Sequence, residues 1–322
     1  MQAQLIALDW GTSSLRAYKL GHLGQVLEQR SLSLGIMHLP DGNDFEAALA
    51  EACGDWLAAN PEAALIACGM VGSAQGWLEA PYCEAPARLA DIGAALCRLR
   101  TRSGRVLHIV PGVIQQGRLP NVMRGEETQV LGLLQGEAGS PQPAEQLIGL
   151  PGSHSKWVSV VEGAITHFDT FMTGELYAVA CAHSILGRTQ QRGGPFDEQA
   201  FDRGVAVAVS EEGAIGPLAT LFSARTLGLT GQLGPGAQAD YLSGLMIGHE
   251  LRALAEVRRA RHAERCDSAV TLIGNDQLCA RYQRALPTCG FSLRKVASQA
   301  TETGLWALAL AAGLIFSPAK EL

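Results

Sequence analysis

The chain lacks the sequence features of several common binding and anchoring devices. Its lysines are only Lys19, Lys156, Lys295 and Lys320, and its formal net charge is −6, so it offers no basic field for nucleic acid. No Gly-Lys-Ser/Thr tripeptide and no G-x-G-x-x-G run occurs, which excludes a Walker loop and the dinucleotide-binding fingerprint. The longest apolar run, residues 305–316, is shorter than the roughly 20 residues that a membrane helix needs. We therefore expect neither nucleic acid nor a membrane as a partner.

Cysteine is present but not in a pattern typical of metal or disulfide sites. The eight cysteines are scattered, with no C-x-x-C pair and no histidine at metal-ligand spacing. A positively charged segment followed by an apolar stretch, as in a secretory signal, does not precede the first expected strand. These observations predict reduced core thiols in a cytoplasmic protein.

Length and composition favour two compact domains. The 322 residues are 47% hydrophobic and 17% charged, and a chain of this size can build two separate cores. A polar Pro/Gly segment, residues 136–145, is typical of a boundary. We expect an N-terminal lobe over residues 1–138 and a C-terminal lobe over residues 145–302. A terminal helix over residues 303–322 is expected to pack back on the first lobe.

The most informative segment is residues 5–16, where an apolar strand leads through Asp9 into a turn of small, donor-rich residues. Four consecutive apolar residues indicate a strand covered on both faces. Gly11, Thr12 and Ser13 can direct backbone N–H groups and hydroxyls toward one anion. Strand patterns on both sides predict a hairpin and not a helix after this turn. We expect a nucleotide-phosphate loop, the alternative being an ordinary hairpin turn.

A second strand, donor-rich turn and strand occupy residues 146–161, about 140 residues after the first. Gly152, Ser153 and Lys156 are candidates for a second phosphate site; exposed turn residues are the alternative. The repetition predicts an α/β protein of two lobes, with duplicated mixed β-sheets flanked by helices. The first lobe would hold the substrate. A further apolar strand ends at Gly274, which opens a helix, so we expect the adenine side of the nucleotide there, in the C-terminal lobe.

Phosphoryl transfer needs a cation near the phosphates and a base for the acceptor hydroxyl. Asp9 could hold Mg²⁺ through water, because Mg²⁺ keeps several waters and takes few protein carboxylates. Arg124 precedes Glu126 and Glu127, and a guanidinium can neutralise an anion or keep a carboxylate ionised as a base. The helix dipole alone would also explain two acids in a first turn. The base stays open between Glu126, Glu127 and a carboxylate not singled out.

In this order along the chain, these segments resemble the 2-dehydro-3-deoxygalactonokinase family, a branch of the actin and hexokinase superfamily with its ribonuclease H-like fold. The resemblance covers nearly the full length and is carried by residues 9–16, 69–77, 80–82, 121–129, 151–157, 172–176 and 243–248. It implies ATP-dependent phosphorylation of 2-dehydro-3-deoxy-D-galactonate at its 6-hydroxyl, a step of galactonate catabolism, with ATP and Mg²⁺ as cofactors. The second loop reads Pro-Gly-Ser-His-Ser where the wider superfamily usually has an acid, so the magnesium and base assignments of hexokinase do not transfer.

The implied substrate carries a carboxylate, for which Arg16 and Arg124 are the candidate partners. Gly72, Ser73 and Trp77 lie in a stretch rich in glycine and aromatic residues that could surround a small polar ligand, or only cross between elements. Two other functions remain as alternatives. One is a hexose or amino-sugar kinase of the same fold, and the other is a non-catalytic sugar-sensing protein on this scaffold. A small-molecule sugar acid is the expected partner, and a homodimer is left open.

Overall fold

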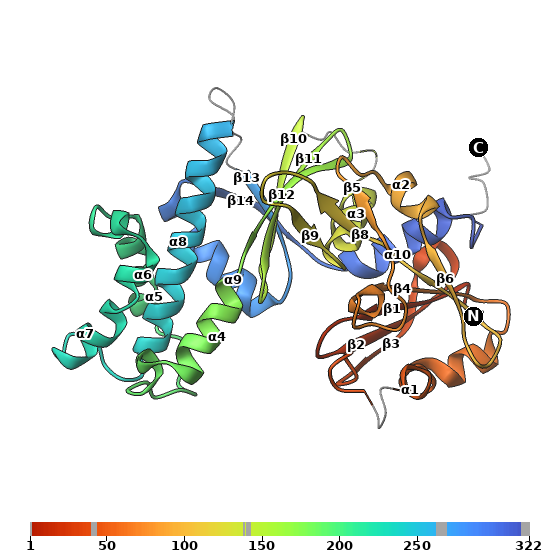
Figure 1. Cartoon of the computed structure of the whole chain (residues 1–322), viewed down its shortest axis with the longest axis horizontal. Helices are drawn as coiled ribbons and strands as arrows, with labels where there is room; N and C mark the ends of the chain where they lie inside the picture. The colour runs from red at the N-terminus through yellow and green to blue at the C-terminus, as the bar shows by residue number, and fades with distance from the viewer. Residues whose placement is uncertain (1, 40–43, 138, 140–142, 262–268, 317–322) are drawn as a thin grey trace. The chain divides into compact units, whose positions relative to one another are not determined.

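The computed structural model describes residues 2–39, 44–137, 139, 143–261 and 269–316. The chain divides into two compact units (Figure 1). Unit 1 comprises Met1–Ala144, Val160–Phe168 and Gln299–Leu322, and unit 2 comprises Glu145–Ser159 and Asp169–Ser298. Residues 160–168, which the sequence analysis placed in the C-terminal lobe, group with unit 1.

A six-stranded mixed sheet forms the centre of unit 1. In the order β3-β2-β1-β4-β7-β6, it begins with an antiparallel meander and continues with the parallel strands β1, β4 and β7. The last strand, β6, is antiparallel to β7. The strands are β1 (Leu5–Trp10), β2 (Leu15–Leu20), β3 (Val26–Leu32), β4 (Ala64–Gly69), β6 (Cys97–Arg100) and β7 (Val106–Ile109). Because residues 5–8 are fully buried, both faces of β1 are covered, as its apolar run predicts.

Helices and a small second sheet complete unit 1. The helices are α1 (Phe45–Ala59), α2 (Leu89–Ala94), α3 (Glu126–Gly136) and α10 (Ala300–Ala311), and the three-stranded sheet contains β5 (Tyr82–Glu84), β8 (Gly112–Gln115) and β9 (Asn121–Met123). Helix α1 contacts β1 and β2, whereas α10 contacts β1 and β4. The sequence predicted a terminal helix over residues 303–322, and α10 ends earlier, at Ala311. Residues 317–322 of the predicted range lie outside the described residues.

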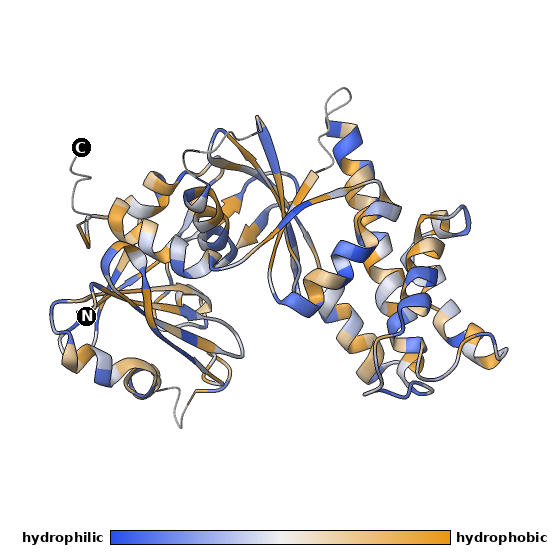
Figure 2. Ribbon diagram, turned by 180° about the vertical axis from the view of Figure 1, so that it is seen from behind, coloured by the Kyte–Doolittle hydropathy of each residue, from blue (hydrophilic) through white to orange (hydrophobic). Residues whose placement is uncertain are grey.

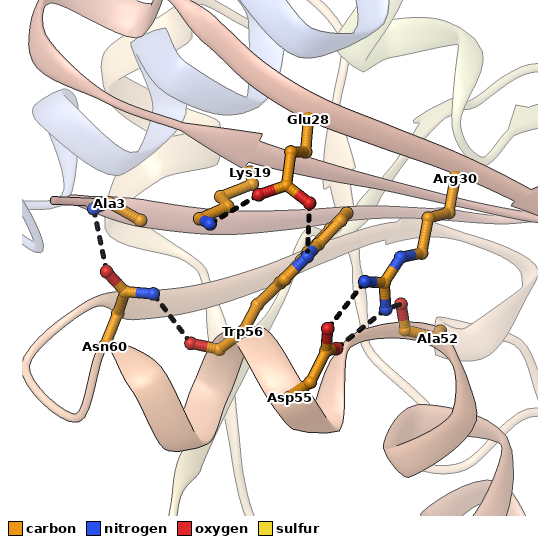
Figure 3. A network of polar contacts seen from close by, with 8 residues as sticks. All are labelled: Ala3, Lys19, Glu28, Arg30, Ala52, Asp55, Trp56 and Asn60. Carbon is orange, nitrogen blue, oxygen red and sulfur yellow. Dashed lines mark hydrogen bonds and ion pairs between the residues drawn. The ribbon is translucent and has the colours of Figure 1, made fainter. Parts of the chain in front are cut away.

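A polar network fixes α1 to the sheet (Figure 3). The Trp56 indole donates to Glu28 Oε2 at 3.0 Å, and the Arg30 guanidinium lies 4.2 Å from the centre of the Trp56 ring. Arg30 also donates both terminal nitrogens to Asp55, at 2.7 and 2.6 Å. The Asn60 amide accepts from the Ala3 N–H at 2.9 Å. Such bidentate and stacked contacts set the position of the helix along the sheet.

A second sheet repeats the order of the first five strands. Its strands β12-β11-β10-β13-β14 again combine two hairpin-connected neighbours with parallel strands, and residues 160–168 of β11 and β12 are the part of it that groups with unit 1. The strands are β10 (Glu145–Leu150), β11 (Ser155–Val161), β12 (Ala164–Phe171), β13 (Ala269–Ile273) and β14 (Ser292–Ala297). The predicted α/β class with duplicated mixed sheets is therefore confirmed. The small sheet of unit 1 was not predicted from the sequence.

The helices of unit 2 are α4 (Thr173–His183), α5 (Glu198–Val209), α6 (Pro217–Thr220), α7 (Ser223–Leu229), α8 (Gln238–Arg261) and α9 (Asp276–Ala285). Helix α8 is buried over most of its length, while Figure 2 shows a hydrophilic C-terminal end, where Arg259 and Arg261 lie. In the part of the chain that the structure describes, no helix has the length and apolar character to cross a bilayer.

Helices α3 and α10 of unit 1 pack with almost no space between their backbones. A Cβ atom on Gly132 would overlap the carbonyl oxygen of Ala300, and one on Gly304 would overlap the carbonyl oxygen of Thr128. By contrast, nothing lies within 4 Å of a Cβ on Gly136, at the end of α3. Gly132 and Gly304 thus allow a close contact between α3 and α10, and a side chain at either position would push the two helices apart.

We expect Gly304→Ala to destabilise the protein by at least about 2 kcal/mol, because the added methyl must push α10 away from α3. Gly136→Ala is the matched control and should change stability by less than about 1 kcal/mol. Urea unfolding followed by circular dichroism measures both. Equal midpoints for the two variants would contradict the close packing.

Candidate active site

The carboxyl ends of β1 and β4 meet the start of α3 in unit 1. Asp9 is paired with Cys68 across the two parallel strands. A Cβ on Gly69 would lie 3.6 Å from Asp9 Oδ1, and a Cβ on Gly125 would lie 3.3 Å from the Gly69 Cα. Both glycines have positive φ, +89° and +111°, a conformation that other residues adopt only with strain. The structure thus brings Asp9 and the residues around Glu126, distant in sequence, to one place.

Asp9 lies opposite Arg16 in the β1–β2 hairpin. The Arg16 Nη1 is 3.1 Å from Asp9 Oδ2, and the Asp9 side chain is 17% exposed. Burial raises the pKa of Asp9, and the Arg16 charge partly offsets this rise. Since burial disfavours the charged form, a cation beside this carboxylate would be stabilising. The site therefore fits a single-carboxylate contact to Mg²⁺ through water.

The first predicted loop, residues 11–14, is a tight turn held by a neighbouring segment. Ile36 N donates to the carbonyl of Gly11 at 3.0 Å, and a Cβ on Gly35 would overlap the backbone of Thr12 and Ser13. Thr12 and Ser13 are exposed, so their hydroxyls are accessible to a ligand. The segment around Gly35 was not predicted from the sequence, because its role depends on a contact with residues more than 20 positions earlier in the chain.

The two acids at the start of α3 have different surroundings. Glu127 is fully buried: its Oε2 accepts from the Gly125 N–H at 2.7 Å and its Oε1 accepts from the Thr128 hydroxyl at 3.0 Å. Glu126 is half-buried, and its Oε2 accepts from the Arg124 N–H at 3.0 Å. Adjacent helical residues point about 100° apart, which explains the difference. Of the two carboxyl groups, Glu126 is thus the more accessible to solvent.

Burial raises the pKa of Glu127 to about 8, and the neighbouring Glu126 charge contributes in the same direction. The hydrogen bonds from Gly125 and Thr128 oppose the rise. Glu127 is consequently a carboxyl group that holds a proton through much of the neutral range. It also influences Cys68, whose pKa is raised well above its usual value mainly by burial.

Arg124 has donors that the described protein atoms do not use. Its Nη2 donates to the carbonyl of Ala80 at 2.7 Å, and its guanidinium lies 4.4 Å from the centre of the Tyr82 ring. Among the described residues, Nε and Nη1 have no acceptor although both are buried. The same holds for the Ser73 hydroxyl, and a Cβ on Gly72 would lie 3.0 Å from Nη1. Buried unpaired donors are costly, and an acceptor would remove the cost.

Trp77 belongs to an aromatic cluster. Its ring stacks on Phe45 at 5.6 Å and meets Trp10 edge-on at 6.0 Å. This packing accounts for Trp77 without a ligand, and its contact with substrate stays a prediction.

The second predicted loop, in unit 2, lies on the start of α4. A Cβ on Gly174 would overlap the carbonyl oxygen of Gly152, and Glu175 N donates to the Ser153 carbonyl at 3.0 Å. The helix begins at Thr173 with Met172 as the N-cap. A cavity of about 140 Å³ beside the loop is lined by Gly152, Thr173, Gly174, Tyr177, Ser243, Met246, Ile247, Leu278, Arg281 and Tyr282.

Gly274 lies against the second loop, whereas the side chain of Lys156 contacts Thr170. Lys156 is buried in β11, and its Nζ donates to the Thr170 hydroxyl at 2.8 Å; its contact with phosphate stays a prediction. A Cβ on Gly274 would lie 3.3 Å from the Pro151 carbonyl oxygen, so the end of β13 meets the loop. Asn275 caps α9 by accepting from the Gln277 N–H at 3.0 Å.

Two sheets with a repeated strand order, each with a donor-rich loop after its first strand, define the class of protein as an α/β protein built on a duplicated unit. The 2-keto-3-deoxy-galactonokinase family model matches residues 9–308, and the chain belongs to this family. The 2-dehydro-3-deoxygalactonokinase of Escherichia coli (strain K12) is 35% identical over 313 residues, which cover 96% of this chain and 98% of that protein. A Rhizobium meliloti (strain 1021) protein, given the same enzyme name provisionally, is 36% identical over 95% of this chain and 96% of its own length.

A solved structure supports the fold over the full length. The crystal structure of a Sinorhizobium meliloti protein, provisionally assigned as a 2-dehydro-3-deoxygalactonokinase, superposes with a TM-score of 0.83 at 33% identity. It covers 95% of this chain and 98% of that one. The chain is thus an enzyme of the sugar-acid kinase family.

Glu127 should make stability depend on pH. The ordinary pKa of a glutamate, 4.5, rises here to about 8, so the folded protein binds this proton more tightly than the unfolded chain. The resulting stabilisation is complete below about pH 4.5 and is lost as pH rises through about 8. We expect the free energy of unfolding, from urea titrations between pH 5 and pH 9, to fall less in Glu127→Gln than in the unmodified protein.

The control for this measurement is Glu79→Gln, which alters an exposed carboxylate of the same unit. It should follow the unmodified protein over the whole range. Parallel curves for the Glu127→Gln and unmodified proteins would show that this carboxyl group does not titrate between pH 5 and pH 9.

Proposed function

We propose that the protein transfers the γ-phosphoryl group of ATP to the 6-hydroxyl of 2-dehydro-3-deoxy-D-galactonate, in galactonate degradation. The observation that carries this proposal is membership of the family over residues 9–308, together with a relative of that name that is 35% identical over 98% of its length. A hexose kinase or a non-catalytic sugar sensor is not favoured by these matches.

The proposed phosphate contacts come from both loops. Backbone N–H groups and hydroxyls of Thr12 and Ser13 would bind phosphate oxygens, as would Gly152 and Ser153. Gly11 would shape the first loop, because its N–H donates to the Ser14 carbonyl at 2.9 Å. Asp9 would hold Mg²⁺ through water, and the ion would neutralise charge that develops on the transferred group. Lys156 and Gly274 are further proposed contacts to phosphate and to the adenine side of ATP.

Arg124 is the proposed partner of the substrate carboxylate, with Gly72, Ser73 and Trp77 beside the sugar acid. Arg124 is preferred to Arg16 because Arg16 already pairs with Asp9, whereas two nitrogens of Arg124 have no acceptor among the described residues. A carboxylate accepts two hydrogen bonds from a guanidinium. The pair would therefore favour a sugar acid over a neutral sugar.

Glu126 is the proposed general base for the 6-hydroxyl. A base must come within hydrogen-bond reach of the proton that it removes, and Glu126 is half-buried whereas Glu127 is fully buried. Glu127 would then orient the start of α3 without touching substrate.

The proposal also covers the cellular location and the partners of the protein. The described cysteines, for example Cys53 and Cys68, are free thiols, which supports a cytoplasmic location. The sugar acid is the proposed small-molecule partner, and neither nucleic acid nor a membrane is proposed as a partner. A homodimer is compatible with this proposal.

The function is tested by ADP release with 2-dehydro-3-deoxy-D-galactonate, glucose and galactose as acceptors. We expect turnover with the keto-acid and little with either hexose, because a neutral sugar would leave the Arg124 charge unpaired. Arg124→Met should raise KM for the acid, with a loss in kcat/KM equivalent to about 2 to 5 kcal/mol. Hexose turnover at rates equal to those with the keto-acid would overturn the assignment, and an equal loss in Arg16→Met would shift the carboxylate contact to Arg16.

The base is tested by Glu126→Gln. Loss of a general base lowers kcat by about 100-fold to 10,000-fold, and KM for the acid should change little. Glu127→Gln is the matched comparison and should retain most of kcat. Normal kcat in Glu126→Gln would remove this residue from proton transfer.

A further inference from the structure

An arginine in unit 2 lies between two cavities. Arg281, in α9, lines the 140 Å³ cavity beside the second predicted loop, and it also lines a larger cavity of about 880 Å³. Phe196, Asp240 and Arg284 are among the other residues that line the larger cavity. Because the Arg281 side chain is 26% exposed, its guanidinium group can be approached from the cavities that it lines.

Two contacts hold this guanidinium group in place. Its Nη2 donates to Asp240 Oδ1 at 2.7 Å, and its Cζ lies 4.2 Å from the centre of the Phe196 ring. Asp240 is itself fixed, because its Oδ2 accepts from the Asp197 N–H at 2.9 Å and only 10% of its side chain is exposed. The position of Arg281 is thus set without a ligand, so a ligand that contacts it need not immobilise a free side chain.

These contacts leave donors of Arg281 unused. Nη1 is covered by neighbouring atoms and has no acceptor among the described residues. Such a buried donor is costly, and an acceptor would remove the cost. Arg284, three residues later in α9, is different: its Nε and Nη2 donate to the two oxygens of Asp202 at 2.6 Å each, and its Nη1 lies 2.7 Å from Glu198 Oε2. All three of its nitrogens therefore have a carboxylate partner.

The smaller cavity offers little else that could bind an anion strongly. Arg281 is the one charged residue among the ten described residues that line it. The two tyrosines of this lining have committed hydroxyls, since Tyr177 donates to the Ala239 carbonyl at 3.3 Å and Tyr282 donates to Glu250 Oε2 at 2.7 Å. Glu250 is 3% exposed and is not part of the lining. No carboxylate of the described lining would therefore repel an anion in this cavity.

We propose that Arg281 binds a phosphate oxygen of ATP in the cavity beside the second loop, through the nitrogens that Asp240 does not engage. The proposal rests on ATP being the phosphoryl donor of the proposed function. A guanidinium group matches the geometry of phosphate oxygens, and Gly152, from the loop that we propose to bind phosphate, lines the same cavity. A small shift of the side chain would bring Nη1 to the oxygen, and the cavities on both sides leave room for it.

The proposed contact is a directed hydrogen bond more than a long-range attraction. Asp240 compensates much of the Arg281 charge, so the remaining benefit comes from donors that already lie in position. Loss of a hydrogen bond between charged groups lowers affinity by about tenfold to a hundredfold. This loss requires the phosphate to be present. Adenosine has the base and the ribose of ATP but no phosphate, so its affinity should not depend on Arg281.

Calorimetric titration of the full chain with ATP and Mg²⁺, in the absence of the sugar acid, measures this contact. Adenosine is measured by its displacement of ATP. In Arg281→Met we expect the dissociation constant for ATP to rise about tenfold to a hundredfold, while that for adenosine changes by less than about twofold. The readout is the ratio of the two dissociation constants, because a general loosening of the site would weaken both ligands alike and leave the ratio unchanged.

Arg284→Met is the matched control. Arg284 lies on the same helix and is not among the residues that line the smaller cavity, so its replacement should leave the ratio as in the unmodified protein. An unchanged ratio in Arg281→Met would overturn the proposal and leave Arg281 as a structural partner of Asp240 and Phe196.

Arg281→Lys decides the question if Arg281→Met loses the cooperative urea transition. Its ammonium group keeps a positive charge beside Asp240, but it lacks the planar fork that can engage a carboxylate and a phosphate at once. The ratio should therefore also rise in this variant, and an unchanged ratio would contradict the contact.

These measurements separate the role of Arg281 from the proposed function. ATP binding that depends on Arg281, but without phosphorylation of the sugar acid, would contradict the proposed function alone. Phosphorylation of the sugar acid, together with a ratio that Arg281→Met does not change, would contradict the role of Arg281 alone.

Discussion

The close approach of two backbones at Gly69 and Gly125 is the constraint on which the site in unit 1 depends. Strand β4 ends at Gly69 and α3 is capped by Gly125, and both residues need positive φ. A side chain at Gly69 would approach the carbonyl oxygen of Trp10 to 2.8 Å. Without this approach, the acids at the start of α3 would lie farther from Asp9. The backbone contact at Gly69 and Gly125 therefore determines how close the acids of α3 lie to Asp9.

Buried carboxyl groups occur behind the predicted loops of both units. Glu127 lies behind the first site and Glu250 behind the second, and burial is the largest cause of the raised pKa of each. Their nearest partners are donors from backbone, hydroxyl or indole groups. Such groups favour protonation in the folded state and reduce stability as they ionise. Their placement beside loops that we propose to bind phosphate is typical of functional sites, where perturbed pKa values cluster.

Arginine side chains have contrasting roles in unit 1. Arg30 has its donors committed to Asp55 and the Ala52 carbonyl and stacks on Trp56, and it fixes α1 on the sheet. Arg124 stacks on Tyr82 in a comparable way but retains two nitrogens without an acceptor among the described residues. The difference separates an arginine that completes the fold from one with buried donors that the described residues do not use. Composition alone does not distinguish them.

The duplicated strand, loop and strand units could be predicted from the sequence, because buried strands and small-residue turns depend on local patterns such as residues 5–16. The sequence also supplied Asp9, Arg124, Glu126 and Glu127 as candidates. Only the tertiary structure separated Glu126 from Glu127 and identified Glu250, since burial and hydrogen-bond partners depend on contacts between distant segments. Trp157 and Tyr282, for instance, reach Glu250 across 93 and 32 residues of chain. A local sequence pattern does not show which distant residues contact a carboxyl group. Those contacts nevertheless determine the free energy of its charged form.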